Sequence, residues 1–155
     1  SAFIRVLISD CEDFISDLQG VHDDEHKSLF TPRAIIAMAA RANGVIPIDT
    51  VHIKVHDLED LEVNLQIAKK MGFEGMLVLN PKELTLVHNY FTPSELEVLE
   101  AKEMLQLYED AKKDGKGVAV KNGKFIGPPM VLAAKETIHK HNLIVEKNSF
   151  RNKIK

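Results

Sequence analysis

The sequence predicts an α/β fold followed by a helical segment that contains a β-hairpin. Short apolar runs rich in β-branched residues alternate with longer stretches whose apolar residues recur at helical spacing. This alternation is typical of a parallel sheet whose faces are covered by helices. The pattern changes after residue 91, where a long helix and a hairpin signal follow. We therefore expect two regions, residues 1–91 and 92–155.

Three strand and helix pairs are expected in the first region. The strands are predicted over residues 3–8, 45–55 and 76–79, and the helices over 14–18, 31–43, 57–71 and 82–89. The first strand reads as buried. Thr31-Pro32 and Asp57 are helix-start signals, and Gly44 and Gly72 are helix-end signals. One apolar stripe at helical spacing is expected to form core: Leu58, Leu61, Leu65 and Ala68.

The second region begins with the capping-box pattern Thr92-Pro93-Ser94-Glu95, which predicts a helix to about residue 114. Asn122-Gly123 is a strong hairpin signal, so residues 118–120 and 124–126 are expected to pair. A last helix is predicted over 130–141. The basic run 147–155 is interpreted as a solvated, frayed tail.

Composition excludes several classes of function. The chain is 45% hydrophobic and 28% charged with a net charge of -3, which favours a globular protein without nucleic acid or anionic membrane as a partner. No apolar run approaches the roughly 18 residues that a transmembrane helix needs. Cys11 is the single cysteine, so no internal disulfide forms. This favours a reducing, intracellular compartment, either the cytoplasm or an organelle matrix.

A cluster of acids follows the first predicted strand. Asp10, Glu12 and Asp13 come directly after it, and ligands of α/β folds bind at the carboxyl ends of strands. If the strand continued, Asp10 and Glu12 would point to one side and Asp13 to the other. Carboxylates are suitable ligands for Mg²⁺. The alternative is that they are solvated or stabilise the start of the following helical turn.

The other candidate ligands favour structural interpretations. His22 and His26 lie in a polar loop that we expect to be exposed. His52 and His56 would lie about 13 Å apart in a strand, too far to share a metal ion. His139 and His141 do not share a helix face. Cys11 has no identifiable base beside it and is interpreted as a packed thiol. The sequence identifies no catalytic residue.

Several segments, taken in order, resemble one enzyme family. They are Asp10-Cys11-Glu12-Asp13-Phe14, Arg33 with Ala39-Ala40-Arg41-Ala42-Asn43-Gly44, Ile48-Asp49, Met71-Gly72-Phe73-Glu74-Gly75, Phe91-Thr92-Pro93-Ser94-Glu95, and Gly115-Lys116-Gly117 with Asn122-Gly123-Lys124. Together they resemble citrate lyase beta-subunit-like proteins, which belong with the malyl-CoA lyases and HpcH/HpaI aldolases. The resemblance covers nearly the whole chain.

The resemblance implies that residues 1–91 form about strands six to eight of a (β/α)8 TIM-type barrel. Residues 92–155 would be a C-terminal helix–hairpin–helix extension used for oligomer contacts, as in a trimer. It implies a Mg²⁺-dependent carbon–carbon lyase acting on an acyl-CoA thioester with a small oxo-acid moiety. Asp13 and Glu12 would bind the metal, and Asp10 and Asn80 the substrate. Because such a barrel needs roughly 250 residues, we expect this chain, which starts inside a strand, to be an incomplete enzyme.

Two positions depart from the family pattern. Leu79-Asn80-Pro81 stands where the family usually has Ile-His-Pro, and Gly127 stands where its hairpin usually carries an Asp. Glycine cannot transfer or orient a proton. An alternative is therefore a non-catalytic relative that acts as a binding or oligomeric scaffold protein. A third interpretation is a natural half-barrel that pairs with itself.

Overall fold

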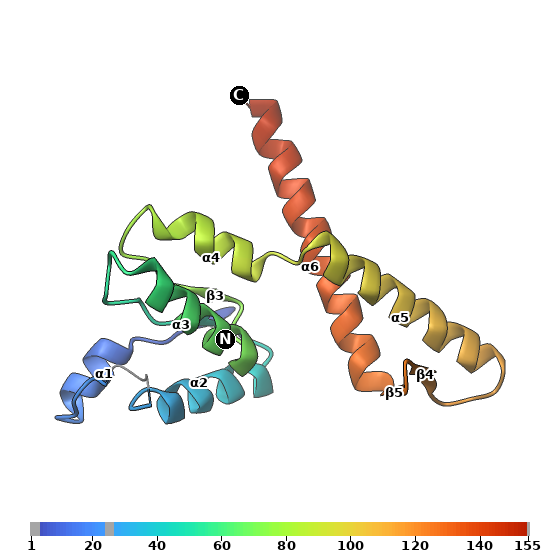
Figure 1. The fold of residues 1–155 in the computed structure, drawn as a ribbon, viewed down its shortest axis with the longest axis horizontal. Helices are drawn as coiled ribbons and strands as arrows, with labels where there is room; N and C mark the ends of the chain where they lie inside the picture. The colour runs from blue at the N-terminus through green and yellow to red at the C-terminus, as the bar shows by residue number, and fades with distance from the viewer. Residues whose placement is uncertain (1–3, 24–26, 155) are drawn as a thin grey trace. The chain divides into compact units, whose positions relative to one another are not determined.

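The computed structural model describes residues 4–23 and 27–154, with side chains described up to Arg151. The chain forms two compact units, Ser1–Phe91 and Thr92–Lys155 (Figure 1). The first unit contains β1 (Val6–Ile8), α1 (Cys11–Asp17), α2 (Phe30–Ala42), β2 (Ile46–Asp49), α3 (Leu58–Met71), β3 (Gly75–Met76) and α4 (Glu83–Phe91). The second contains α5 (Glu95–Lys113), β4 (Ala119–Lys121), β5 (Lys124–Ile126) and α6 (Pro128–Ile154).

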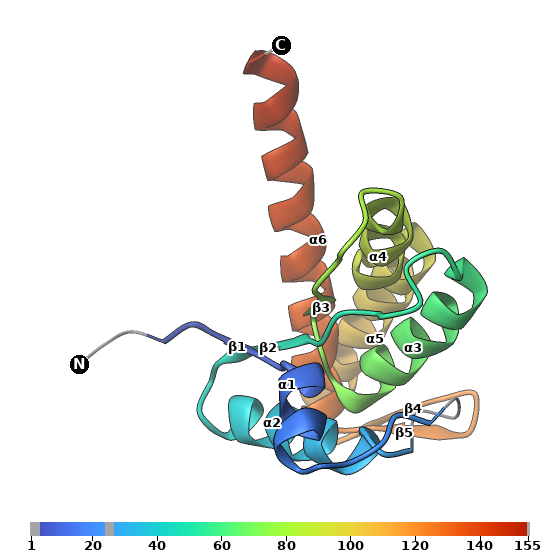
Figure 2. The ribbon, with the colours of Figure 1, turned by 90° about the vertical axis from the view of Figure 1, so that its left-hand side faces the viewer.

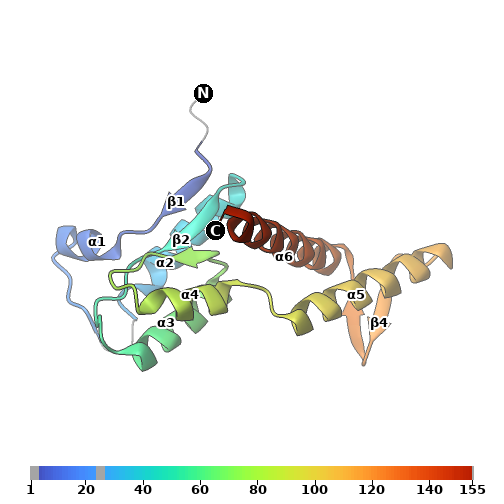
Figure 3. The same ribbon diagram turned by 90° about the horizontal axis from the view of Figure 1, so that it is seen from above.

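The first unit is a parallel sheet in the order β1-β2-β3 (Figure 3). Val6 is opposite Ile46 in the register of β1 and β2, and Ile48 is opposite Gly75 in that of β2 and β3. The α/β class predicted from the sequence is thus observed. The strands are shorter than predicted: β2 ends at Asp49, and turns at Val55 and Asp57 follow it. Three residues of β1 pair with three of β2.

One face of this sheet carries the core of the unit. The core cluster is formed by side chains of α2, α3, α4, β3 and the α3–β3 turn: Ala37, Leu61, Leu65, Ala68, Phe73, Met76 and Val87. Three members of the predicted stripe are thus fully buried, but Leu58, at the first turn of α3, is 43% exposed. The predicted signals at Asp57 and Gly72 are confirmed, because Asp57 caps α3 and Gly72 ends it at φ 93°.

The opposite face of the sheet is largely uncovered within the described residues. Val6, Ile8 and Ile46 are 43%, 50% and 41% exposed. The prediction of a buried first strand is therefore wrong for this chain. β1 is at the edge of the sheet, and the described helices do not cover its outer face. Apolar side chains in this position need a further layer to bury them.

Helix starts differ from the sequence prediction by a few residues, most clearly at α1, α2 and α5. α1 begins at Cys11, not Phe14, so it includes Glu12 and Asp13. α2 begins at Phe30, one residue before Thr31. α5 is opened by a capping box two residues after the predicted one. Ser94 Oγ accepts from the Glu97 N–H at 3.2 Å, and Glu97 Oε2 accepts from the Ser94 N–H at 2.8 Å.

The second unit packs the hairpin β4–β5 against α5 and the start of α6. Asn122 and Gly123 have φ values of 50° and 74°, as a tight hairpin turn requires. α6 is one continuous helix whose C-terminal half extends beyond α5 (Figures 1 and 2). The prediction that the last helix ends near His141 is wrong, because α6 continues to Ile154. The prediction of a frayed tail is wrong for the same reason, since residues 147–154 are helical. Among the described residues, no helix is both long and apolar enough to span a membrane.

Candidate functional site

The acids identified in the sequence lie at the carboxyl end of β1. Asp10 is the N-cap residue of α1 but makes no side-chain capping bond, and Glu12 and Asp13 occupy the first turn. Negative side chains are stabilised there by the helix dipole. The strand does not continue through the acids, because β1 ends at Ile8 and the backbone is helical from Cys11. Consecutive helical residues do not share a face, so Glu12 and Asp13 diverge.

Glu12 and Asp13 have different surroundings. His22 Nε2 lies 2.8 Å from Glu12 Oε2, which links the connection after α1 back to that helix. His22 therefore lies within hydrogen-bond distance of Glu12, and its side chain is 36% exposed, as expected for this loop. Asp10 and Asp13 are exposed. The predicted loop residue His26 lies outside the described residues. Asp13 is thus the accessible carboxylate of the pair.

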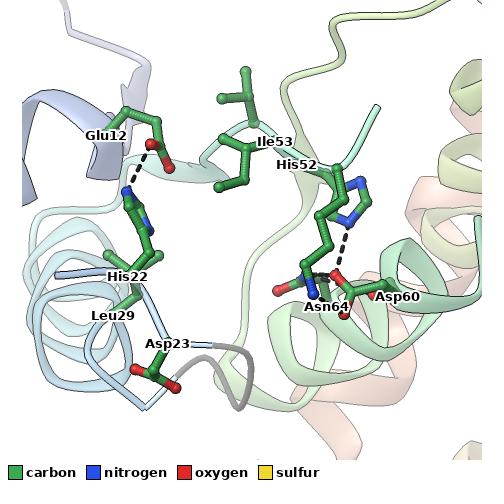
Figure 4. A pocket seen from close by; sticks show the side chains of 10 residues that line it. Glu12, His22, Asp23, Leu29, His52, Ile53, Asp60 and Asn64 are labelled. Atoms are coloured by element: carbon green, nitrogen blue, oxygen red, sulfur yellow. Dashed lines mark hydrogen bonds and ion pairs between the residues drawn. The ribbon is translucent and has the colours of Figure 1, made fainter. Parts of the chain in front are cut away.

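A polar cavity of about 220 Å³ lies beside Glu12 (Figure 4). Its walls come from α1, from the α1–α2 connection, from the loop after β2 and from α3. The lining side chains are Glu12, His22, Asp23, Leu29, Val51, His52, Ile53, Lys54, Asp60 and Asn64. Since these elements meet near the carboxyl ends of β1 and β2, the cavity lies where ligands of parallel α/β sheets bind.

Asp60 organises one wall of the cavity. Its Oδ2 lies 2.8 Å from His52 Nε2, and its Oδ1 lies 3.2 Å from Lys54 Nζ. His52 is buried, and its Nδ1 has no hydrogen-bond partner within the described part of the chain. The predicted separation of His52 and His56 in a strand does not apply, because both follow the end of β2. His52 points to Asp60, while His56 is exposed.

Behind the acids lies a buried polar network that joins four elements of the unit. Arg33 of α2 donates from Nε to Asp49 Oδ1 at 3.1 Å and forms a second, short bond from Nη2 to Oδ2. The Thr50 N–H donates to Asp49 Oδ1 at 2.9 Å, and Thr50 Oγ1 accepts from the Cys11 N–H at 3.1 Å. Ser9 Oγ lies 2.9 Å from Cys11 Sγ. Every one of these residues is buried.

Burial is the largest influence on the pKa values of Cys11 and Asp49 in this network. It raises the pKa of the Cys11 thiol, and the Asp49 charge adds to the rise, while Ser9, Arg33 and Thr50 oppose it. Burial also raises the pKa of Asp49, against the opposing hydrogen bonds and charge of Arg33. Cys11 is 1% exposed. The interpretation of Cys11 as a packed thiol agrees with both observations, since a reactive cysteine needs access and a lowered pKa.

Asn80 lies at the same edge of the sheet as the acids, after β3. Its Nδ2 donates to the Val55 carbonyl at 3.4 Å, and its Oδ1 accepts from the Lys82 N–H at 3.0 Å. The bond to Val55 holds the loop after β3 against the loop after β2, and the bond to Lys82 fixes the turn before α4. β1 and β3 flank β2, so the strands that lead to Asp10 and Asn80 are about 10 Å apart. Nearby Glu83 is fully buried, and its Oε2 accepts from the Leu79 N–H at 3.1 Å.

The carboxylates of Glu12 and Asp13 fit Mg²⁺ only as part of a larger set of ligands. Mg²⁺ usually takes one or two protein carboxylates and completes its shell with water and substrate. Among the described residues, no group of three or more histidine, cysteine or acidic side chains could hold a metal ion. Asp13 offers an exposed carboxylate, whereas Glu12 lies within 2.8 Å of His22 and lines the cavity. A complete ligand set would therefore need further groups, such as water and substrate.

Sequence reasoning missed the buried network. Arg33 and Asp49 stand in segments that carried the family resemblance, but their pairing depends on α2 packing against β2. Thr50 gave no signal, because a threonine after a strand is common. A buried arginine needs an acid partner, so the Arg33 position on the apolar side of a helix was the usable clue.

Residues 4–81 match the sequence model of the HpcH/HpaI aldolase/citrate lyase family. The chain belongs to this family. It is 33% identical to the citrate lyase subunit beta of Haemophilus influenzae over 124 residues, which cover 80% of this chain and 43% of that protein. It is 27% identical to a (3S)-malyl-CoA thioesterase of Cereibacter sphaeroides over 138 residues, or 89% of this chain and 48% of that protein. The chain therefore spans somewhat under half the length of these curated relatives.

Solved structures share the fold of this family member. CitE from Mycobacterium tuberculosis, solved in complex with magnesium, acetoacetate and coenzyme A, matches with a TM-score of 0.71 and 22% identity, over 87% of this chain and 51% of that chain. A citrate lyase from Burkholderia xenovorans matches with a TM-score of 0.76 and 16% identity, over 93% of this chain and 47% of that chain.

Proposed function

We propose that this chain supplies part of the active site of a Mg²⁺-dependent lyase that makes or breaks a carbon–carbon bond in a CoA thioester of the citryl, malyl or citramalyl type. The observation that carries the proposal is the exposed carboxylate of Asp13 in the first turn of α1, at the carboxyl end of a parallel strand, in a chain of this family. The neighbouring residue Glu12 lines a polar cavity at the same end of the sheet. The names of its relatives, a citrate lyase subunit and a malyl-CoA thioesterase, agree with this substrate class.

In this proposal residues 1–91 are the last three strand–helix units of a (β/α)8 barrel. The uncovered face with Val6, Ile8 and Ile46 supports it, since in a closed barrel these side chains would face the packed interior. The remaining strands would also cover the free edge of β1. Residues 92–155 would be the extension that makes contacts between subunits of a homo-oligomer.

Each candidate residue would have its own role in this site. Asp13 would bind Mg²⁺ directly, Glu12 would add negative charge from the same helix turn, and Asp10 and Asn80 would contact the substrate. When bound, Mg²⁺ would stabilise the negative charge that develops on the oxo-acid half. The Asn80 amide would be held in place by its bonds to Val55 and Lys82, so that it could meet the substrate without a large loss of side-chain entropy.

Titration of the full-length gene product with Mg²⁺ tests the metal site. We expect Asp13→Asn to weaken Mg²⁺ binding by about tenfold or more, because a charged ligand is lost. Asp17→Asn is the matched control, since Asp17 is an exposed acid at the other end of the same helix. Equal Mg²⁺ affinity in wild type and Asp13→Asn would remove Asp13 from the site.

A non-catalytic scaffold is the second candidate, and Gly127 and Asn80 support it. Gly127 offers no acid on the hairpin. Both polar atoms of the Asn80 amide already have hydrogen-bond partners, Val55 in the loop after β2 and Lys82 in its own loop. A lyase assay of the full-length protein with citryl-, malyl- and citramalyl-CoA separates the candidates. Binding of an acyl-CoA without cleavage, together with gain of cleavage in the double variant Asn80→His, Gly127→Asp, favours the scaffold.

A further inference from the structure

The N-terminus of α1 has no cap from its own sequence. Asp10, in the N-cap position, makes no side-chain bond to the free N–H groups of the first turn. An uncapped helix start leaves backbone donors to be satisfied by other partners. For the Cys11 N–H that partner is Thr50 Oγ1, at 3.1 Å, from a residue 39 positions later in the chain.

We infer that Thr50 is a positioning residue: its hydroxyl caps α1 from outside and thereby fixes the first turn, with Glu12 and Asp13, against the end of β2. The inference rests on the proposed function only for the consequence that the metal site depends on this bond. The bond itself joins two loops at the carboxyl edge of the sheet, where small displacements move the side chains that would contact a ligand.

Thr50 is itself held from behind. Its N–H donates to Asp49 Oδ1, and Asp49 is bound by two donors of Arg33. Thr50 is 6% exposed and Asp49 is 0% exposed, so water does not compete for these bonds. The hydrogen-bonded path runs from α2 through the end of β2 to α1, and Thr50 is its last member before the acids.

The side chain of Cys11 gives a second attachment that does not replace the first. Cys11 Sγ lies 2.9 Å from Ser9 Oγ, and the Ser9 N–H donates to the Ile48 carbonyl at 2.9 Å. This attachment holds the start of α1 to β1 and β2 through the side chain. The Thr50 bond instead fixes the backbone amide, so it sets the direction in which the helix leaves the strand.

The test compares Thr50→Val, which keeps the shape of the side chain but loses the hydroxyl, with Thr50→Ser, which keeps the hydroxyl. Amide hydrogen exchange of Cys11 is measured in this chain. We expect exchange about five- to tenfold faster in Thr50→Val and near the wild-type rate in Thr50→Ser, since one hydrogen bond is removed. Thr137→Val is the matched control, because Thr137 Oγ1 donates to the Ala133 carbonyl in α6, in the other unit.

Mg²⁺ affinity of the full-length protein is measured for the same variants. A several-fold loss in Thr50→Val that Thr50→Ser restores supports the positioning role. Fast Cys11 exchange with unchanged Mg²⁺ affinity would restrict Thr50 to a structural role and overturn the inference, as would wild-type exchange in Thr50→Val. If no variant, wild type included, binds Mg²⁺, the proposed function fails, and the exchange rates still decide whether Thr50 caps α1.

Discussion

Arg33 and Asp49 form a two-bond ion pair in the interior of the first unit, with side chains that are 1% and 0% exposed. The pair joins α2 to the end of β2 and anchors the network that reaches α1. A buried charge whose partner is removed keeps its full desolvation cost, whereas an exposed pair is worth little.

We therefore expect Asp49→Asn to lower the free energy of unfolding by about 3–5 kcal/mol. Urea unfolding followed by circular dichroism measures it. The matched control is Glu74→Gln, which removes the partner of Arg41 in a pair that is 47% and 29% exposed. That loss should be at most about 1 kcal/mol. Similar losses of unfolding free energy in the two variants would show that the buried pair stabilises the fold no more than the exposed pair does.

The hairpin limits what can replace Gly127. A Cβ built there would lie 2.6 Å from Cε1 and Cζ of the Phe125 ring. The ring is 53% exposed and can rotate away, so we expect Gly127→Ala to cost about 1 kcal/mol, the lower end for an overpacked site. In a double-mutant cycle with Phe125→Ala, the cost of Gly127→Ala should largely disappear. Additive losses would contradict contact with the ring as the cause.

The buried thiol predicts a pH dependence. Burial raises the Cys11 pKa above its ordinary value of 9.0, so the folded state favours the protonated thiol. The resulting stability is fully present below the pKa of the unfolded chain and is lost as pH rises through the pKa of the folded chain. The difference in unfolding free energy between wild type and Cys11→Ala should fall from pH 8 toward higher pH. A constant difference over that range would refute the shift.

The last helix can be tested with proline. Asn148 lies inside α6, where a proline removes a hydrogen bond and clashes with the preceding turn at a cost of about 3 kcal/mol. We expect Asn148→Pro to abolish helical Cα chemical shifts from about Ile144 onward, while Asn148→Ala preserves them. Random-coil shifts over 147–154 in the wild type would instead restore the frayed tail predicted from the sequence.

The local signals in the sequence predicted most elements, because turns and caps depend on neighbouring residues. Asp57 and Gly72 define α3, and Asn122-Gly123 defines the hairpin. Their errors are also local. Strand lengths were overestimated because apolar runs continue past the last paired residue, as in the segment after Asp49, where Val51 and Ile53 lie in an irregular loop.

The site was predicted less well than the fold. The acids after β1 were identified. Their geometry depends on where α1 begins, because successive side chains point in different directions in a helix than in a strand. His22 is an exposed loop residue, as expected, whereas His52 was expected in a strand and instead follows the end of β2. Sequence reasoning did not predict that both line the cavity within 2.8 Å of acids, Glu12 and Asp60, that are ten and eight residues away in the chain.

The sequence by itself determined the α/β class, the family and the acidic cluster after the first strand, because these depend on periodicity and on contiguous motifs. The tertiary structure alone decided that Arg33 pairs with Asp49 and that Thr50 caps α1. The physical reason is that burial raises the cost of an unpaired polar group, so a buried donor takes whichever acceptor packing brings to it. For the Cys11 amide that acceptor lies on the neighbouring strand end, 39 residues later in the chain.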